Sequence, residues 1–242
     1  PGEFLPVAED TGLIRPLTSY VLDMVLEQLH KWSEQRLELC VAVNITGRDL
    51  FDQRFAYEVK DLLRKWNVRP SQLELEVTEN AVLIDPVRAH SILHSLSGFG
   101  VRLAIDDFGT GNSSLAQLKR LPVEVLKIDK SFVLNMLADE DDATIVRSTI
   151  ELAHNLGLQV VAEGIESAPM WNLLRQLGCD IGQGFYLSGP LPAERLSTLL
   201  ERLPRDMARA TGRPLALAAT PAPRVRQPGG EESAPEPVRA VS

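Results

Sequence analysis

Short apolar runs alternate with longer amphipathic segments along most of the chain. In residues 13–35, apolar side chains recur at helical spacing, and the same pattern predicts helices over 49–66, 86–97, 113–120, 139–156, 167–177 and 192–202. Six apolar runs lie between these segments, at residues 40–43, 73–75, 103–105, 123–126, 160–162 and 180–182. Short strands that alternate with helices are typical of βαβ units, so the pattern predicts an α/β fold with a parallel sheet.

Each apolar run ends on a polar residue of a type that binds a hard cation or works beside one. These residues are Asn44, Glu76, the pair Asp106 and Asp107, Lys127, Glu163 and Gln183. A barrel of parallel strands brings its carboxyl-terminal strand ends together on one face, where barrel enzymes hold their active sites. Residues spread from 44 to 183 are therefore expected to converge on one metal site.

The adjacent acids Asp106 and Asp107 give the strongest local indication of such a site. Neighbouring strand residues point to opposite faces, so both carboxylates can share a site only where the strand ends and turns. The following Gly109-Thr110-Gly111 supplies a turn. Taken alone, the pair could instead cap the next helix; Glu76 could face solvent, and Asn44 could be a turn residue.

The candidate ligands are carboxylates and one amide, which select Mg²⁺ or Mn²⁺ over Zn²⁺. Such a set suits a two-metal centre of the kind that phosphodiesterases and nucleases use. All four histidines fall in predicted helices, away from the strand ends. His90 and His94 are four residues apart and could chelate a metal, although a solvated position on a short amphipathic helix is the simpler interpretation.

Composition narrows the class of protein further. The 242 residues are 44% hydrophobic and 24% charged, with a net charge of −8 and no basic block, so we expect no DNA or RNA partner. Cys40 and Cys179 lie in apolar contexts typical of buried thiols in a reducing cytosol. We find neither a membrane-spanning stretch nor a signal peptide, which favours a cytoplasmic location. Residues 204–242 hold 7 of the 16 prolines and predict a disordered tail.

Six motifs appear together in the order and at the spacing of a known family. They are Val43-Asn44-Ile45-Thr46, Leu75-Glu76-Val77-Thr78-Glu79, Asp106-Asp107-Phe108-Gly109-Thr110-Gly111, Leu126-Lys127-Ile128-Asp129-Lys130-Ser131-Phe132, Ala162-Glu163-Gly164-Ile165-Glu166 and Gly178-Cys179-Asp180-Ile181-Gly182-Gln183-Gly184. The set resembles the EAL domains, phosphodiesterases that hydrolyse the bacterial messenger cyclic-di-GMP. The resemblance covers residues 1–203 and implies a modified TIM-type (β/α)8 barrel, with about six of its eight strands in this chain.

The resemblance implies a role for each candidate residue. The residues implied as ligands of two Mg²⁺ or Mn²⁺ ions are Asn44, Glu76, Asp106, Asp107 and Glu163. Asp106 would bridge the two ions, and Lys127 would contact the attacking water. Gln183 would position water or ligand, and Glu79 would steady the loop after the Asp pair. Lys127, Glu163 and Asp107 would thus carry the hydrolysis of one phosphodiester, giving the linear dinucleotide.

Three departures from the family pattern change these expectations. The Glu-Ala-Leu motif, whose glutamate is a metal ligand in the family, would lie upstream of Pro1. Asn112 replaces an aromatic residue and Gly189 replaces an arginine. Without the first two strands we expect exposed strand edges, poor stability or aggregation, and weak or absent turnover by these 242 residues.

Two other functions stay open. The chain could be a degenerate EAL module that binds cyclic-di-GMP or a protein partner without turnover, or an unrelated metal-dependent barrel hydrolase.

The resemblance also implies a role in bacterial signal transduction that regulates biofilm formation and motility. It implies a homodimer formed near the helix after the Asp pair and an upstream sensor or cyclase domain. A tether of the parent protein to the inner membrane is compatible with the sequence.

Overall fold

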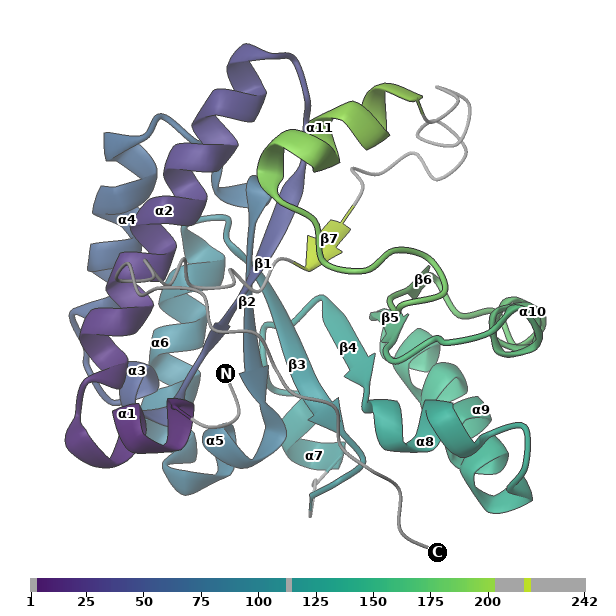
Figure 1. The fold of residues 1–242 in the computed structure, drawn as a ribbon. Helices are drawn as coiled ribbons and strands as arrows, with labels where there is room; N and C mark the ends of the chain where they lie inside the picture. Colours follow the sequence, from purple (N-terminus) through teal and green to yellow (C-terminus); the bar gives the residue numbers. More distant parts are fainter. Residues whose placement is uncertain (1–3, 112–114, 203–215, 219–242) are drawn as a thin grey trace, which may run out of the picture.

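The strands of the chain form one parallel sheet that curves into a half-barrel (Figure 1). The computed structural model describes residues 4–111, 115–202 and 216–218. The strands run in the order β6-β5-β4-β3-β2-β1-β7 across the sheet. Their bounds are β1 Cys40–Ile45, β2 Leu73–Thr78, β3 Arg102–Phe108, β4 Val125–Ile128, β5 Gln159–Ala162, β6 Ile181–Gly182 and β7 Ala216–Ala218. The six strands predicted from the apolar runs are therefore confirmed, as is the barrel-type α/β fold.

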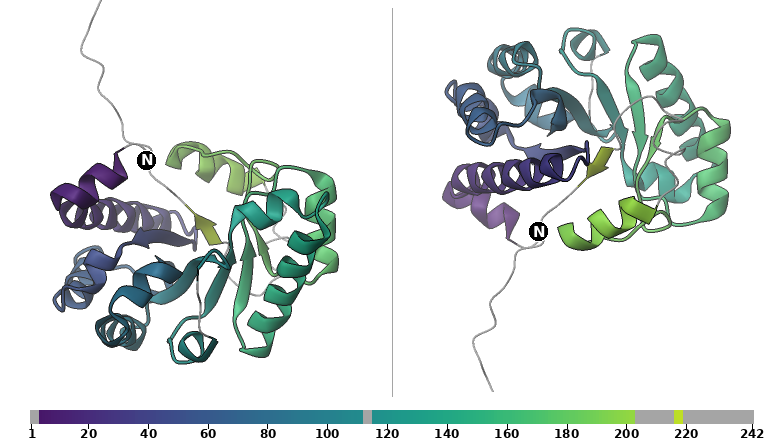
Figure 2. Two further views of the ribbon diagram at one scale, coloured as in Figure 1. Left: turned by 90° about the horizontal axis from the view of Figure 1, so that it is seen from below. Right: turned by 90° about the horizontal axis from the view of Figure 1, so that it is seen from above.

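Helices lie on the outer side of the curved sheet (Figure 2). Their bounds are α1 Leu5–Thr11, α2 Ile14–Glu34, α3 Gly47–Leu50, α4 Phe55–Lys65, α5 Glu79–Ile84, α6 Pro86–Gly98, α7 Leu115–Leu118, α8 Lys130–Asn135, α9 Glu140–Asn155, α10 Ala168–Gln176 and α11 Ala193–Arg202, with a short 3₁₀ helix at Pro70–Gln72. The outer layer is interrupted between α2 and α11 (Figure 2). Every helix among the described residues is too short or too polar to span a bilayer.

Side-chain alternation along the strands separates the core from the inner face of the half-barrel. On β2, Leu73, Leu75 and Val77 are fully buried in the core between sheet and helices. The alternate residues Glu74 and Glu76 are also buried, and they point to the other face of the strand. This alternation places charged side chains inside the curve of the sheet. On an ordinary surface strand, the same side chains would face solvent.

The helix predicted over residues 49–66 is two helices in the structure. α3 ends at Leu50 and α4 begins at Phe55, with a turn between them. In this turn the Asp52 carboxylate accepts a hydrogen bond from the backbone N–H of Arg54 (3.0 Å) and one from the Arg15 guanidinium (2.9 Å). A side chain that bonds nearby backbone competes with the helix, so the prediction of one continuous helix was wrong here.

The prediction of a disordered tail over 204–242 does not hold at Ala216–Ala218. These residues form β7, which pairs in parallel with Cys40, Val41 and Ala42 of β1. β1 was expected to leave an exposed edge, and the backbone groups of β7 cover part of it. Such pairing is a tertiary event that local composition does not encode. The rest of the predicted tail, like Asn112, lies outside the described residues.

Candidate metal centre at the strand ends

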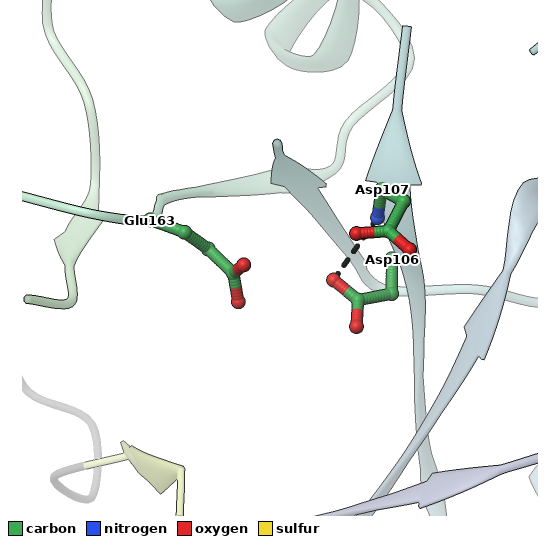
Figure 3. A group of neighbouring side chains, drawn as sticks. All are labelled: Asp106, Asp107 and Glu163. Carbon is green, nitrogen blue, oxygen red and sulfur yellow. Dashed lines mark hydrogen bonds between the residues drawn. The ribbon is translucent and has the colours of Figure 1, made fainter. Parts of the chain in front are cut away.

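The adjacent acids Asp106 and Asp107 share one site because the backbone of β3 changes conformation between them. Asp107 adopts a left-handed conformation, with φ 53°, and the pairing of β3 with β4 shifts register between Ile105 and Phe108. The backbone N–H of Asp107 donates a hydrogen bond to Oδ1 of Asp106 (3.0 Å, Figure 3). The irregularity turns the second carboxylate toward the first, as a regular strand would not.

Glu163 completes a group of three carboxylates. It follows directly after β5, and its side chain extends toward the Asp pair on β3 (Figure 3). One carboxylate oxygen from each of Asp106, Asp107 and Glu163 lies within 4.8 Å of the other two. Oxygen ligands at this spacing are compatible with a divalent hard cation.

Lys127 stands among the carboxylates on the inner face of the half-barrel. Its Nζ lies 2.8 Å from Oε2 of Glu76, 3.2 Å from Oδ1 of Asp106 and 2.6 Å from Oε1 of Glu163. Burial opposes the charge on Lys127, but the three carboxylates outweigh it and hold the pKa of the lysine above its ordinary value. The ammonium is therefore charged at neutral pH and offsets part of the carboxylate charge.

Three carboxyl groups of the centre, those of Glu76, Asp107 and Glu163, have raised pKa values. Burial, only partly offset by Lys127, raises the pKa of Glu76 to about 7. Burial and the charge of Asp106 raise the pKa of Asp107 to about 6. Burial likewise raises the pKa of Glu163, against the effect of Lys127. Crowded carboxylates that resist ionisation are groups that an added cation would stabilise in their charged form.

Asn44 and Gln183 lie at the strand ends beside these carboxylates, and both are exposed. Asn44 pairs in register with Glu76 of the neighbouring strand. The backbone N–H of Gln183 donates to the carbonyl of Ala162 (2.8 Å), which fixes Gln183 next to the strand end that carries Glu163. All the residues predicted as ligands or catalytic groups therefore lie at or near the carboxyl-terminal ends of the strands.

Glu79 contacts the loop that follows the Asp pair. It is buried at the start of α5, and its Oε2 accepts a hydrogen bond from the backbone N–H of Gly109 (3.4 Å). A Cβ atom on Gly111 would lie only 2.7 Å from Oε1 of Glu79, so the loop passes close to this carboxylate. Glu79 therefore lies against the loop, and its predicted role in steadying that loop stays a prediction.

Asp129 is a further acidic residue at the centre that the sequence analysis did not single out. It follows directly after β4, begins α8 as its N-cap and lies against the Asp107 carboxylate. Its charge contributes to the raised pKa of Asp107. Asp129 is two residues from Lys127 on the same strand end, and this alternate spacing could have identified it.

Comparison with known proteins shows the family to which this chain belongs. The sequence profile of the EAL domain matches residues 1–190. The chain belongs to the EAL domain family. The curved parallel sheet and the acidic strand ends described above are thus those of an EAL domain, and the recognition made from six motifs is confirmed.

Several relatives of this EAL domain have names that state an activity. MucR of Pseudomonas aeruginosa, named as a bifunctional diguanylate cyclase/cyclic di-GMP phosphodiesterase, is 42% identical over 197 residues, which cover 81% of this chain and 29% of that protein. The cyclic di-GMP phosphodiesterase PA2567 of the same species is 37% identical over 202 residues, covering 84% and 34%. The signaling protein YkoW of Bacillus subtilis is 40% identical over 204 residues, covering 84% and 26%. The chain thus spans only about a quarter to a third of these relatives.

Solved structures of EAL domains have the same fold. The MucR phosphodiesterase in complex with c-di-GMP superposes with a TM-score of 0.79 at 42% identity, over 81% of this chain and 80% of that one. The EAL enzyme Bd1971, with cAMP and cyclic-di-GMP bound, superposes with a TM-score of 0.80 at 32% identity, over 83% and 56%.

Proposed function

We propose that this EAL domain hydrolyses cyclic-di-GMP to the linear dinucleotide in a metal-dependent reaction. The observation that carries the proposal is the convergence of Glu76, Asp106 and Glu163 on the ammonium of Lys127. Asp107 lies beside the last two of these carboxylates. Relatives named as cyclic di-GMP phosphodiesterases, and a neighbouring structure named as a c-di-GMP complex, support the choice of substrate.

Asn44, Glu76, Asp106, Asp107 and Glu163 would hold two Mg²⁺ or Mn²⁺ ions. Their oxygen atoms are the donors that these ions prefer, and the raised pKa values of Glu76 and Asp107 mark carboxyl groups short of positive charge. Bound metal ions supply a water of lowered pKa and neutralise charge on the phosphate. Two such metal ions therefore fit the residues present.

The remaining residues would orient the reactants. Lys127 carries a charged ammonium among the carboxylates, from which it would donate a hydrogen bond to the attacking water or to a phosphate oxygen. Gln183, exposed at the neighbouring strand end, would hold water or nucleotide in position. In the reaction a water molecule loses a proton as its oxygen bonds to phosphorus, the phosphorus–oxygen bond to one ribose breaks, and the leaving ribose oxygen takes up a proton.

The proposal is tested by incubating the chain with cyclic-di-GMP and Mn²⁺, with protein in molar excess so that slow turnover is measurable. Chromatography follows the linear product. We expect Asp106→Asn to lower the rate at least about 100-fold, because a ligand of the centre loses its charge. The matched control is Asp141→Asn, which changes an exposed acid on α9 and should leave the rate unchanged.

Two results would contradict hydrolysis. Binding of cyclic-di-GMP in titration calorimetry, without product from this chain or from a longer natural chain that contains it, would favour a binding module. Product formed equally by wild type and Asp106→Asn would mean that the strand-end centre is not the site of reaction.

The further parts of the proposal concern partners and location. A homodimer would form over α7, α8 and the turn after α8, where Leu115, Leu134 and Leu137 are exposed apolar side chains. Sedimentation equilibrium of wild type and Leu137→Glu tests it, and equal masses would exclude this surface.

The long curated relatives support an upstream sensor or cyclase domain, and the free thiols Cys40 and Cys179 support a reducing cytoplasm.

A further inference from the structure

Two histidine side chains and a backbone carbonyl converge on the outer surface, away from the strand-end centre. Nε2 of His94 lies 3.1 Å from Nε2 of His90, and Nε2 of His90 lies 3.1 Å from the carbonyl oxygen of Arg120. The histidines are on α6, and Arg120 lies between α7 and β4. None of these three residues belongs to the acidic centre.

No protonation state of the neutral rings gives each of these three atoms a hydrogen-bond partner of its own. If His90 carries its proton on Nε2, that single hydrogen must serve both the Arg120 oxygen and the His94 nitrogen. If His94 donates instead, the lone pair of His90 faces the lone pair of the carbonyl at 3.1 Å. A cation would accept electron pairs from all three atoms at once.

The separation of the two ring nitrogens matches that of two ligands on one metal ion. Zinc binds imidazole nitrogen at about 2.0–2.1 Å, so two nitrogens on one ion lie about 3.3 Å apart at the tetrahedral angle and about 2.9 Å apart at a right angle. The observed distance of 3.1 Å lies between these values. The two rings could therefore bind one ion with little movement.

The backbone holds the three donors in place before any ion binds. α6 buries Ala89, Ile92 and Leu93 against the core, which directs His90 and His94, one helical turn apart, to the outer face. The carbonyl of Arg120 is presented by a turn in which the N–H of Arg120 donates to the carbonyl of Gln117 (2.9 Å). Prior ordering lowers the entropic cost of binding.

We propose that His90, His94 and the carbonyl oxygen of Arg120 form a separate site for a divalent transition-metal ion of the Zn²⁺ class. Two imidazoles select Zn²⁺, Cu²⁺ or Ni²⁺ over the Mg²⁺ and Mn²⁺ that suit the acidic centre. An ion at this site would join α6 to the segment that connects α7 with β4, the strand of Lys127. The assignment goes beyond the proposed hydrolase activity and does not depend on it.

The test is a calorimetric titration of the untagged chain with ZnCl₂ in buffer containing excess Mg²⁺. We expect wild type to bind one equivalent of Zn²⁺ that His94→Ala and His90→Ala bind at least about tenfold more weakly, equal to about 1.4 kcal/mol. His154→Ala, which changes an exposed histidine paired with Asp180, and Asp106→Asn should both retain this equivalent.

A spectroscopic measurement tests the ligands independently. The electron paramagnetic resonance spectrum of one added equivalent of Cu²⁺ should show coupling to two imidazole nitrogens in wild type and in Asp106→Asn. In His94→Ala the coupling to the second nitrogen should be lost. Equal Zn²⁺ affinity in wild type and His94→Ala, or a Zn²⁺ site lost in Asp106→Asn but kept in His94→Ala, would overturn the assignment.

Discussion

At the scale of single residues, Lys127 decides the electrostatic balance of the centre. Three carboxylates contact its ammonium, and 3% of the residue is exposed to solvent. An uncompensated buried carboxylate is costly, whereas one that contacts an ammonium is stabilised. The lysine therefore has a structural effect on the centre as well as its proposed role toward water or phosphate.

Replacing Lys127 by methionine should destabilise the chain in buffer without added metal ions. We expect the free energy of unfolding to fall by about 3 kcal/mol, because Glu76, Asp106 and Glu163 lose their common partner. Urea denaturation with and without Mn²⁺ measures the effect, and Mn²⁺ should stabilise the variant more than wild type. Lys119→Met, at an exposed position, is the control. Equal stability of Lys127→Met and wild type would contradict this account.

Metal binding at the centre should depend on pH through Glu76 and Asp107. Their pKa values, about 7 and about 6, lie above those of ordinary carboxyl groups, so each holds a proton below its own value. An incoming ion must displace these protons, and Mn²⁺ affinity should fall by up to about tenfold per pH unit for each proton displaced. Titrations with Mn²⁺ at pH 8, 7 and 6 check this, with Glu76→Gln as the variant that lacks the higher step. A Mn²⁺ affinity that does not change between pH 8 and pH 6 would refute this expectation.

At the scale of elements, the strand ends depend on close backbone contacts between the segments that follow β5 and β6. The N–H of Ile165 donates to the carbonyl of Gln183 (3.0 Å), and a Cβ atom on Gly184 would lie 2.2 Å from the backbone nitrogen and oxygen of Ile165. No side chain fits at position 184 without moving this backbone. Glycine is required there to bring Gln183 beside the segment that carries Glu163.

Gly184→Ala should therefore separate the two segments. We expect a loss of about 1–3 kcal/mol in the free energy of unfolding, together with weaker Mn²⁺ binding, because Glu163 moves. Gly98→Ala is the matched control, since a Cβ atom at Gly98 meets nothing within 4 Å. That change should be neutral or stabilise α6 by up to about 1 kcal/mol. Equal melting temperatures for the two variants would contradict the close-approach argument.

At the scale of the whole molecule, a strand near the end of the described chain, β7, pairs with β1 at one edge of the sheet (Figure 1). Cys40 lies in the paired stretch, and burial raises the pKa of its thiol to about 12. Its reactivity therefore reports whether the edge is covered, since the thiolate is the reactive form.

Leu217→Pro should uncover this edge. Proline removes a backbone N–H and disfavours strand pairing, so β7 should leave β1. We expect the rate of Cys40 labelling by a disulfide reagent at pH 8 to rise at least about tenfold, measured by peptide mass spectrometry. Cys179 is the internal control, because it lies beside β6 at the opposite edge of the sheet and its rate should not change. Unchanged labelling of Cys40 would mean that β7 does not protect it.

The residues of the centre could be predicted because the carboxyl-terminal ends of parallel strands lie on the same side of a sheet. That rule alone brought Asn44, Glu76 and Lys127 together across more than 80 positions of sequence. The break between α3 and α4 and the strand at Ala216–Ala218 escaped prediction, since both depend on contacts with distant residues. The metal ligation itself remains a prediction.

The position of the Lys127 ammonium also bears on the order of events during maturation. Small metalloproteins whose ligands lack an internal counter-charge must wait for their ion before they can fold. Here the positive charge is covalently part of the chain and arrives with β4. Folding would therefore not have to wait for the proposed metal ions, which would then bind to a folded chain by replacing contacts of the Lys127 ammonium. A chain of this kind could be stored in mature form and switched by the ion supply alone.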